Sequence, residues 1–161
     1  KKELQDAGHT FVSNTDSETL IHGYEEWGES LVERLRGMYA FAIWDTRKKK
    51  LFVARDIFGI KPLYYAQMNG TLMFASEIKA FMEHPKFDKV FNEDALGNYL
   101  SFQFVPTNET FFKGVFCLQP GHYFTYENGE LNITRYFEPN FTGDTEKSFE
   151  EIVDDDDDLP F

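Results

Sequence analysis

The sequence predicts an α+β fold built around a largely antiparallel sheet, and three features of the chain lead to this prediction. Short apolar segments with the length of strands lie at residues 38–44, 51–54, 63–66, 71–75, 115–118, 123–126 and 131–135. Asn-Gly pairs at 69–70 and 128–129 join two pairs of these segments, and Asn-Gly is a strong hairpin signal. Segments with helical periodicity lie between the hairpins, so we expect helices packed on an antiparallel sheet.

The first 14 residues predict a short helix followed by a short strand. Residues 1–8 (KKELQDAG) have the form of the last two turns of a helix that Gly8 ends. Residues 11–13 (FVS) are a strand candidate. Because no cap and no apolar run precede this helix, we expect the natural protein to continue upstream of Lys1.

A longer helix is predicted to begin at Thr15. Thr15 and Glu18 have the spacing of a capping box, in which the first residue caps the helix and the fourth reaches back toward it. One apolar stripe follows at helical spacing and consists of Leu20, Tyr24 and Trp27. Gly28 ends this helix, and a second short helix is predicted at 29–36. Its inward-facing residues are Leu31, Val32 and Leu35.

The strands at 38–44 and 51–54 are apolar on both alternating sets of residues. This pattern is typical of strands in a sheet that is covered on both faces. The basic run between them, residues 47–50, is predicted to be a solvated hairpin turn and not a phosphate site.

Two more short helices are predicted in the second half of the chain, at 77–82 and at 94–100. Asn92 is the expected cap of the later helix, and its inward-facing residues are expected to be Leu96, Tyr99 and Leu100. After residue 140 the chain becomes polar and ends in DDDDD-LPF. We therefore divide the chain into a domain at 1–140 and an acidic linker or tail at 141–161.

The composition argues against several functional classes. The formal net charge is −12, and the body stays acidic even without the five consecutive Asp at 154–158, whereas non-specific nucleic-acid binding needs Lys and Arg. No apolar run approaches the roughly 20 residues of a membrane helix. A single Cys excludes an internal disulfide framework. We expect a cytoplasmic protein that binds neither nucleic acid nor a membrane.

The usual catalytic patterns are incomplete in this sequence. Cys117 lies in an apolar segment with no basic neighbour in sequence, so we interpret it as an inert core thiol. The four histidines have no HxH or HxxxH spacing, which predicts no metal site. No glycine-rich phosphate loop and no G-x-S-x-G turn is present.

Two polar sites remain, and the residues alone leave each with two interpretations. Asp16 lies in the first turn of a predicted helix, where its carboxylate either complements the helix dipole or pairs with the ammonium group of a ligand. Arg55, Asp56 and Gly59 follow a buried strand and enter a turn. Either an Arg–Asp pair locks this loop, or the loop forms the wall of a substrate pocket or of a domain junction.

Several stretches of the chain together resemble class II glutamine amidotransferase domains. They are TDSETL at 15–20, RLRGMYAFAIWDTRKKKLFVARDIFGIKPLYYA at 34–66 and FASEIKA at 74–80. The stretch ALGNYLSFQFVPTNETFFKGVFCLQPGHYFTY at 95–126 is similar to asparagine synthetases of the bacterial B type, and not to the purine-pathway or glucosamine-forming amidotransferases. The resemblance covers about residues 1–140.

The resemblance implies a fold of the N-terminal-nucleophile hydrolase type, an αββα sandwich of two antiparallel sheets that is incomplete in this chain. It also implies that an N-terminal Cys hydrolyses glutamine and that the ammonia passes to a C-terminal synthetase domain. There ATP and Mg activate aspartate, which ammonia converts to asparagine. Glutamine and the protein's own synthetase domain are therefore the implied partners.

The resemblance assigns roles to few residues of this chain. Asp16 matches the family's Asp that holds the α-ammonium group of glutamine. Arg55, Asp56 and Gly59 match the family's signature loop, with a structural or pocket-wall role. The chain begins with Lys1 and not Cys, so the nucleophile, the Arg that binds the glutamine carboxylate and the Asn-Gly oxyanion element are expected upstream.

We therefore expect no catalytic residue and no cofactor in this chain, and no glutamine hydrolysis by the chain alone. An uncovered sheet edge or apolar face is expected to promote self-association into a homo-oligomer. Two alternatives stay open: a β-lactam-synthetase-like enzyme, and a non-catalytic remnant that binds an amino acid or a partner protein.

Overall fold

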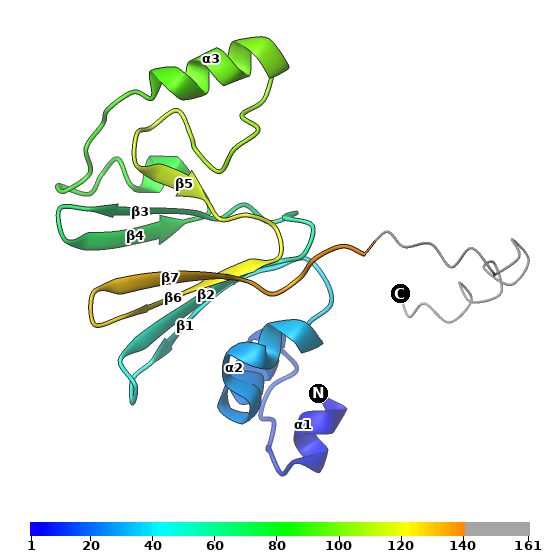
Figure 1. Cartoon of the computed structure of the whole chain (residues 1–161). Helices are drawn as coiled ribbons and strands as arrows, with labels where there is room; N and C mark the ends of the chain where they lie inside the picture. The colour runs from blue at the N-terminus through cyan, green and yellow to red at the C-terminus, as the bar shows by residue number, and fades with distance from the viewer. Residues whose placement is uncertain (141–161) are drawn as a thin grey trace, which may run out of the picture.

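The computed structural model describes residues 1–140 and contains two stacked sheets with helical elements on their outer sides (Figure 1). The helical elements are α1 (Lys2–Asp6), α2 (Asp16–Trp27), the 3₁₀ helices η1 (Gly28–Arg34) and η2 (Ile78–Ala80), and α3 (Glu93–Phe102). The strands are β1 (Ala40–Asp45), β2 (Lys50–Arg55), β3 (Tyr64–Met68), β4 (Thr71–Ala75), β5 (Val115–Cys117), β6 (His122–Glu127) and β7 (Glu130–Arg135).

Both sheets are antiparallel throughout, as the sequence predicts. The first has four strands in the order β1-β2-β6-β7, and the second has three in the order β4-β3-β5. The β3–β4 and β6–β7 hairpins turn at the Asn-Gly pairs, where φ is 49° at Asn69, 72° at Gly70, 53° at Asn128 and 87° at Gly129. Positive φ at both central residues gives the turn whose twist matches that of paired strands.

The outer face of the four-stranded sheet packs against α2 and η1. Tyr24 of α2 and Leu31 and Val32 of η1 contact Phe52 and Ala54 of β2 in one buried cluster. The apolar stripe predicted for the first long helix therefore faces the sheet, and Gly28 ends α2 with a φ of 60°.

The two sheets face each other across a second cluster that includes Val53 of β2, Phe124 of β6 and Tyr65 of β3. Successive residues of a strand point to opposite faces, so Phe52 serves the outer cluster while Val53 serves the inner one, and both are 0 % exposed. Burying one such side chain fully contributes roughly 1.5–3 kcal/mol. The prediction that the strand at 51–54 is covered on both faces is confirmed.

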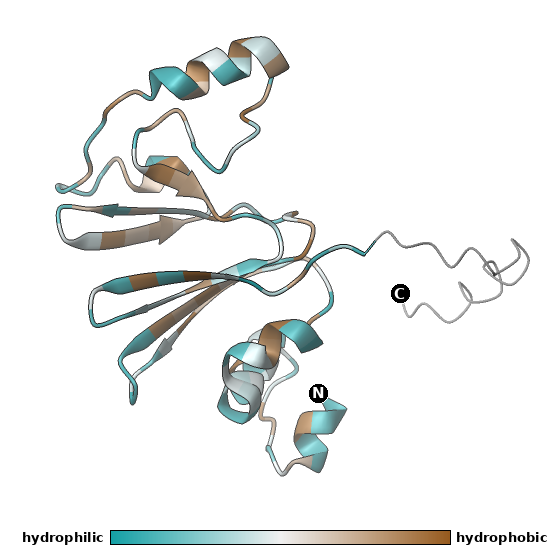
Figure 2. Cartoon of the chain, viewed as in Figure 1, coloured by the Kyte–Doolittle hydropathy of each residue, from teal (hydrophilic) through white to brown (hydrophobic). Residues whose placement is uncertain are grey.

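A third cluster covers the outer face of the three-stranded sheet. Ala66, Met73 and Val115 of its strands contact Phe81 and Phe87, which lie in the turns after η2. The layers are thus helix, sheet, sheet and helix, which is the predicted αββα arrangement. In Figure 2 the strands of both sheets and α3 contain brown hydrophobic segments.

The prediction for the helix after Asn92 is right in position and wrong in orientation. Leu96, Tyr99 and Leu100 of α3 are 37 %, 43 % and 73 % exposed, and among the helix residues only Ala95 is buried. The outer cluster explains this, because Phe81 and Phe87 already cover the sheet that α3 would otherwise reach. Asn92 starts α3, but its amide donates to the Thr110 carbonyl (3.0 Å) and does not cap the helix.

Four smaller predictions also need correction. Residues 11–13 form no strand, because the carboxylate of Glu18 binds the backbone N–H groups of Val12 and Ser13. The helix predicted at 29–36 is the 3₁₀ helix η1, and the one predicted at 77–82 shortens to η2. β1 is not covered on both faces: it lies at a sheet edge, and its Trp44 is 55 % exposed. The proposed tail at 141–161 lies outside the described residues.

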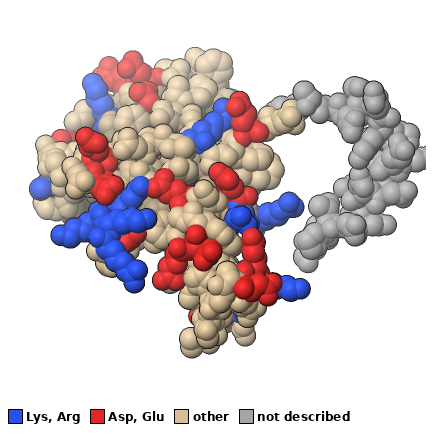
Figure 3. Space-filling view, turned by 60° about the horizontal axis from the view of Figure 1, so that its bottom comes forward, with Lys and Arg blue, Asp and Glu red and all other residues tan. Residues whose placement is uncertain are grey.

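Charged side chains of both signs share the surface. On the face shown in Figure 3, one large group of Lys and Arg side chains is visible, and further side chains of both signs are scattered over the rest of the face. The predicted basic turn is an exposed hairpin turn between β1 and β2, in which Lys48 pairs with Asp45 at 3.9 Å. Lys50 of β2 pairs with Glu29. Within residues 1–140, no helix has the length and apolar character that crossing a membrane requires.

Candidate functional site

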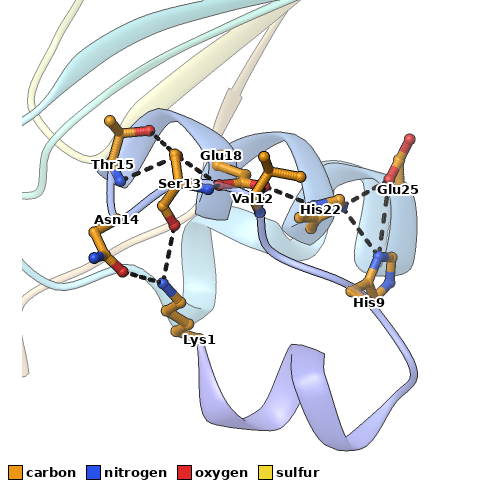
Figure 4. A network of polar contacts seen from close by, with 9 residues as sticks. All are labelled: Lys1, His9, Val12, Ser13, Asn14, Thr15, Glu18, His22 and Glu25. Carbon is orange, nitrogen blue, oxygen red and sulfur yellow. Dashed lines mark hydrogen bonds and ion pairs between the residues drawn. The ribbon is translucent and has the colours of Figure 1, made fainter.

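A hydrogen-bonded network around Glu18 holds the segment that leads into α2 (Figure 4). One carboxylate oxygen of Glu18 accepts the backbone N–H of Val12, and the other accepts the backbone N–H of Ser13, both at 2.6 Å. The Ser13 hydroxyl also donates to Glu18 at 2.5 Å and contacts the Thr15 hydroxyl at 2.8 Å. We call Glu18, Val12, Ser13 and Thr15 the Glu18 network.

This network corrects the predicted capping box. Thr15 is the N-cap by position, but its side chain caps no helix N–H. Glu18 reaches past it to Val12 and Ser13, so the carboxylate holds an extended segment instead of closing the first turn on itself. The hydrogen bond from the Ser13 side chain, with the backbone N–H of Val12, lowers the pKa of Glu18 to about 2.

Asp16 is the first residue of α2 and directly follows the Glu18 network. It is exposed, and within residues 1–140 its carboxylate makes no hydrogen bond or ion pair. A helix N-terminus favours a carboxylate there, so an ionised Asp16 is compatible with the local field. The backbone before it is fixed while the carboxylate stays free, which is the arrangement needed to accept the ammonium group of a ligand.

Arg55, at the end of β2, is buried and binds the loop around it. Its Nε donates to the Lys61 carbonyl at 2.7 Å and its Nη2 to the Gly59 carbonyl at 2.6 Å. Its Nη1 donates to the Leu118 carbonyl and lies 3.1 Å from the sulfur of Cys117. The guanidinium therefore joins the end of β2, the loop at 56–61 and the end of β5.

Asp56 is 0 % exposed and binds the same loop from inside. Its Oδ1 accepts the backbone N–H groups of Phe58 (3.1 Å) and Ile60 (3.0 Å), and its Oδ2 accepts that of Lys61 (3.0 Å). Burial acts to raise the pKa of Asp56, but these three hydrogen bonds, with that of Lys61 the strongest, hold the pKa below its usual value.

Arg55 and Asp56 lock the loop separately and do not form the ion pair that the sequence suggested. Both bind backbone groups of the loop, and no ion pair between them exists in the described part of the chain. Gly59 completes this arrangement with a φ of 65°, and a Cβ there would meet Cγ of Pro120 at 2.7 Å and Nη2 of Arg55 at 3.0 Å. The contacts of Arg55, Asp56 and Gly59 are therefore those of residues that hold the loop in place.

The same loop also borders a hollow of about 570 Å³. Its lining residues include Met38, Ile57, Phe58, Ile60, Tyr136 and Phe137. Phe58 is 74 % exposed and Ile60 is 55 % exposed, so the loop presents apolar side chains to this hollow. The side chains of Arg55 and Asp56 bind the loop from inside, whereas Ile57, Phe58 and Ile60 form one wall of the hollow.

The structure brings Arg55, Asp56 and Gly59 together and leaves Asp16 apart from them. Asp16 does not line the hollow beside the loop. Cys117 is half-buried and accepts a hydrogen bond from Arg55, a basic contact that its sequence neighbours did not reveal. This thiol is engaged with a residue that holds the loop.

Sequence spacing missed one cluster of side chains. Nδ1 of His9 and Nδ1 of His22 lie 3.2 Å apart, although the residues are 13 positions apart, and Oε2 of Glu25 lies beside both. The expectation of no metal site rested on HxH and HxxxH spacings. Only the fold, which brings the segment after α1 against α2, reveals the cluster.

The model of one family, described as the glutamine amidotransferase domain, matches residues 1–137. The chain belongs to the glutamine amidotransferase domain family. Individual relatives also match the chain over most of its length.

The chain is similar to curated asparagine synthetases [glutamine-hydrolyzing]. It is 37 % identical to asparagine synthetase 3 of Bacillus subtilis (strain 168) over 95 % of the chain and 25 % of that protein. It is 41 % identical to asparagine synthetase 1 of the same strain over 88 % of the chain and 22 % of that protein. A putative asparagine synthetase of Mycobacterium tuberculosis (strain H37Rv) is 42 % identical over 83 % of the chain and 21 % of that protein. The chain thus spans about a quarter of the length of these relatives.

Two solved structures share the fold of this chain. The glutamine phosphoribosylpyrophosphate amidotransferase of B. subtilis, complexed with ADP and GMP, matches 86 % of the chain and 26 % of its own, with a TM-score of 0.57 at 22 % identity. The allosteric regulatory enzyme of purine biosynthesis matches 86 % of the chain and 25 % of its own, with a TM-score of 0.58 at 21 % identity. The fold is of the N-terminal-nucleophile hydrolase type, as the sequence predicts.

Proposed function

We propose that this chain belongs to the glutamine-hydrolysing domain of a glutamine-dependent asparagine synthetase. The observation that supports this most strongly is the identity of 37–42 % to proteins of that name over most of the chain. The free carboxylate of Asp16, placed at the start of α2 after a fixed segment, supplies the chemistry for recognising an amino acid.

In this proposal Asp16 binds the α-ammonium group of glutamine. The Glu18 network orders the backbone before Asp16, so little conformational freedom is lost when the ligand binds. A charge-assisted hydrogen bond of this kind contributes roughly 1.5–3 kcal/mol. It discriminates against amides without an α-ammonium group, because these cannot pair with the carboxylate.

The described residues hold glutamine and do not attack it. Cys117, the one thiol of the chain, is engaged with Arg55 at the end of β5. We propose that an N-terminal Cys of the longer protein attacks the side-chain amide carbon of glutamine and forms a thioester, with its own α-amino group as the base. Ammonia leaves, and water then hydrolyses the thioester to release glutamate and regenerate the thiol.

We further propose that the ammonia reaches a synthetase domain in which ATP and Mg activate aspartate. The described residues do not fit an ATP site: the sequence has no glycine-rich phosphate loop, and the buried Asp56 spends its oxygens on three backbone N–H groups. Nucleotide chemistry is therefore assigned to the rest of the protein. Within this chain, the residues bind and position glutamine.

The hollow beside the loop at 56–61 is the proposed contact with the synthetase domain. Its wall contains the exposed apolar side chains of Met38, Phe58 and Ile60, which suit a protein neighbour. Tyr136 and Phe137, near the end of the described residues, also line it. Phe58→Ser in the full-length protein should lower glutamine-dependent asparagine formation more than glutamate release, and equal loss of both would contradict this contact.

We also propose that copies of this chain associate with one another. β1 lies at the edge of its sheet with Trp44 exposed, and α3 presents Leu100 to solvent. Exposed strand edges and apolar side chains favour contacts between copies of a chain. Light scattering over increasing concentration should show a rising mean mass, and a constant monomer mass would contradict this part.

The functional proposal is tested by incubating glutamine with this chain and, in parallel, with a longer chain that extends upstream to a Met-Cys start. Glutamate release by the longer chain alone is the expected result. Release by the shorter chain would place the nucleophile among the residues of this sequence, and Cys117→Ala would then show whether the thiol is responsible. Inactivity of both chains would contradict the glutaminase assignment itself.

A further inference from the structure

The segment after α1 and the helix α2 bring three potential metal ligands to one point (Figure 4). Nδ1 of His9 lies 3.2 Å from Nδ1 of His22, and Nδ1 of His22 lies 3.1 Å from Oε2 of Glu25. Nδ1 of His9 and Oε2 of Glu25 are 3.8 Å apart. Each residue therefore offers one donor atom, and the three atoms form a small triangle.

These separations suit the coordination sphere of a tetrahedral ion. Zinc binds imidazole nitrogen and carboxylate oxygen at roughly 2.0–2.2 Å, so neighbouring ligand atoms of a tetrahedron lie about 3.3 Å apart. A point about 2 Å from all three atoms lies close to the centre of the triangle. An ion there needs no large movement of the side chains. Two His and one Glu are also a ligand set that zinc uses in proteins.

The outer nitrogens of both histidines face carboxylates. Nε2 of His9 lies 3.1 Å from Oε2 of Glu26, and an ionised carboxylate only accepts hydrogen bonds, so this nitrogen carries the proton. Nδ1 of His9 is then left with a free lone pair. Nε2 of His22 lies 3.7 Å from Oε1 of Glu18. Histidines that bind metal almost always direct the other ring nitrogen to such an acceptor, which fixes the tautomer.

In the absence of a metal ion, a proton on Nδ1 of His22 links the three donor atoms. Nδ1–H of His22 donates to Glu25 and to the lone pair of His9. For Nδ1 of His22 to act as a ligand, this proton would have to lie on Nε2, which is 3.7 Å from Oε1 of Glu18. The ion would then take the position between the three donor atoms.

The surroundings allow an ion to enter from solvent. The side chains of His9 and His22 are 16 % and 19 % exposed, whereas that of Glu25 is 58 % exposed. The ring of Phe11 packs edge-on against that of His22 with centroids 4.8 Å apart, which fixes the orientation of this ligand. Three protein ligands leave a fourth position that water can fill.

We propose that His9, His22 and Glu25 form a binding site for a divalent transition-metal ion of the zinc type. The ion would join the segment after α1 to α2, with His22 next to Glu18 of the Glu18 network. This proposal stands apart from glutamine hydrolysis, because it rests on the donor atoms and their separations. Hard cations such as Mg²⁺ prefer all-oxygen ligands and should not compete.

The test is a titration of the untagged chain with Zn²⁺, followed by calorimetry and by the midpoint of thermal unfolding. One ion per chain and a midpoint that rises with zinc concentration are expected, because an ion that binds the folded state stabilises it. His9→Gln and Glu25→Gln should each weaken binding at least tenfold. Glu26→Gln should weaken it by roughly 10- to 100-fold through the orientation of His9.

Matched variants outside the cluster serve as controls. His84→Gln, His122→Gln and Glu83→Gln should keep the zinc affinity of the parent chain. Circular dichroism checks the fold of each variant, and the visible absorption of bound Co²⁺ reports a tetrahedral site directly. Unchanged zinc affinity in His9→Gln and Glu25→Gln, equal losses in the control variants, or the absence of binding at micromolar zinc would each overturn the proposal.

Discussion

In both the loop before α2 and the loop after β2, a carboxylate holds the backbone by accepting its N–H groups. The two loops differ in whether they also present a free carboxylate to solvent. In the first, the carboxylate of Glu18 accepts two consecutive backbone N–H groups. In the second, the carboxylate of Asp56 accepts three. Both loops lie in stretches that resemble the same family. Yet the first ends at Asp16, an exposed carboxylate without a partner in the described chain, whereas the second buries its acidic residue completely.

This difference separates binding residues from structural residues. The carboxylate of Asp56 accepts three backbone N–H groups and is 0 % exposed, so no ligand reaches it and Asp56 shapes the loop. Asp16 gains its geometry from Glu18 and keeps its own oxygens free. In each loop, the residues that hold the backbone differ from those that are free to bind. Substitutions should therefore affect stability and recognition separately.

The largest effect on stability is expected for Asp56→Asn. The amide keeps one acceptor oxygen, but its NH₂ group would face the N–H of Lys61 or those of Phe58 and Ile60, leaving buried donors without a partner. A loss of about 3 kcal/mol in the free energy of unfolding is expected, measured by urea denaturation. Asp45→Asn is the control: Asp45 ends β1, and the two backbone N–H groups that it accepts, those of Arg47 and Lys48, are exposed, so water can replace the lost acceptor and the loss should be smaller. Equal losses would contradict the buried role of Asp56.

The second-largest loss of stability is expected for Gly59→Ala. The positive φ of 65° disfavours any side chain, and the added Cβ would meet Pro120 at 2.7 Å. Together these should cost about 2–3 kcal/mol. Gly70→Ala separates the two contributions, because Gly70 has a φ of 72° with nothing within 4 Å, and it should lose only about 1 kcal/mol. If both variants lose the same amount, the close contact with Pro120 does not matter.

A smaller, pH-dependent effect is expected for Glu18→Gln. The pKa of Glu18 falls from 4.5 to about 2 on folding, so its contribution is complete above about pH 4.5 and is lost as the pH falls toward 2. The variant should be less stable than the parent near neutral pH and should approach it near pH 2. Thermal midpoints between pH 2 and 6 check this, with Glu83→Gln as the control. A constant difference across this range would mean that ionised Glu18 is not the source.

Asp16→Asn is expected to have the smallest effect on stability. The residue is exposed and makes no hydrogen bond within residues 1–140, so the free energy of unfolding should change by less than about 0.5 kcal/mol. Urea denaturation beside Asp56→Asn gives the comparison directly. A large loss would show that Asp16 is a structural residue like Asp56, and the contrast between the two loops would fail.

The sequence predicted the strands, the hairpins and the αββα layers because each depends on local pattern. The strand around Phe52 and Val53 is apolar on both sides, and it is buried on both sides. Asn-Gly at 69–70 fixed a turn through its own conformational preference. Asp16 and the loop of Arg55 were singled out from motifs, since those residues follow helix-start and strand-end signals that the sequence contains; the binding role of Asp16 stays a prediction.

What the sequence could not predict depends on contacts between distant segments. The apolar side of α3 was expected inside, but Phe81 and Phe87 take the place against the sheet, and no helical pattern reports that competition. The reach of Glu18 to Val12 depends on how the preceding segment folds back. The pairing of His9 with His22 has no short-range spacing at all.

The central claim, that Asp16 recognises the α-ammonium group of glutamine, is tested most directly with two substrates and two enzymes. In the full-length protein, kcat/KM is measured for glutamine and for 4-carbamoylbutanoate, which is glutamine without its α-amino group, using the parent and Asp16→Asn. The account predicts that the variant loses roughly 10- to 150-fold on glutamine and changes little on the analogue, because only glutamine can form the charge-assisted bond. Equal losses on both substrates, or no loss on glutamine, would contradict it.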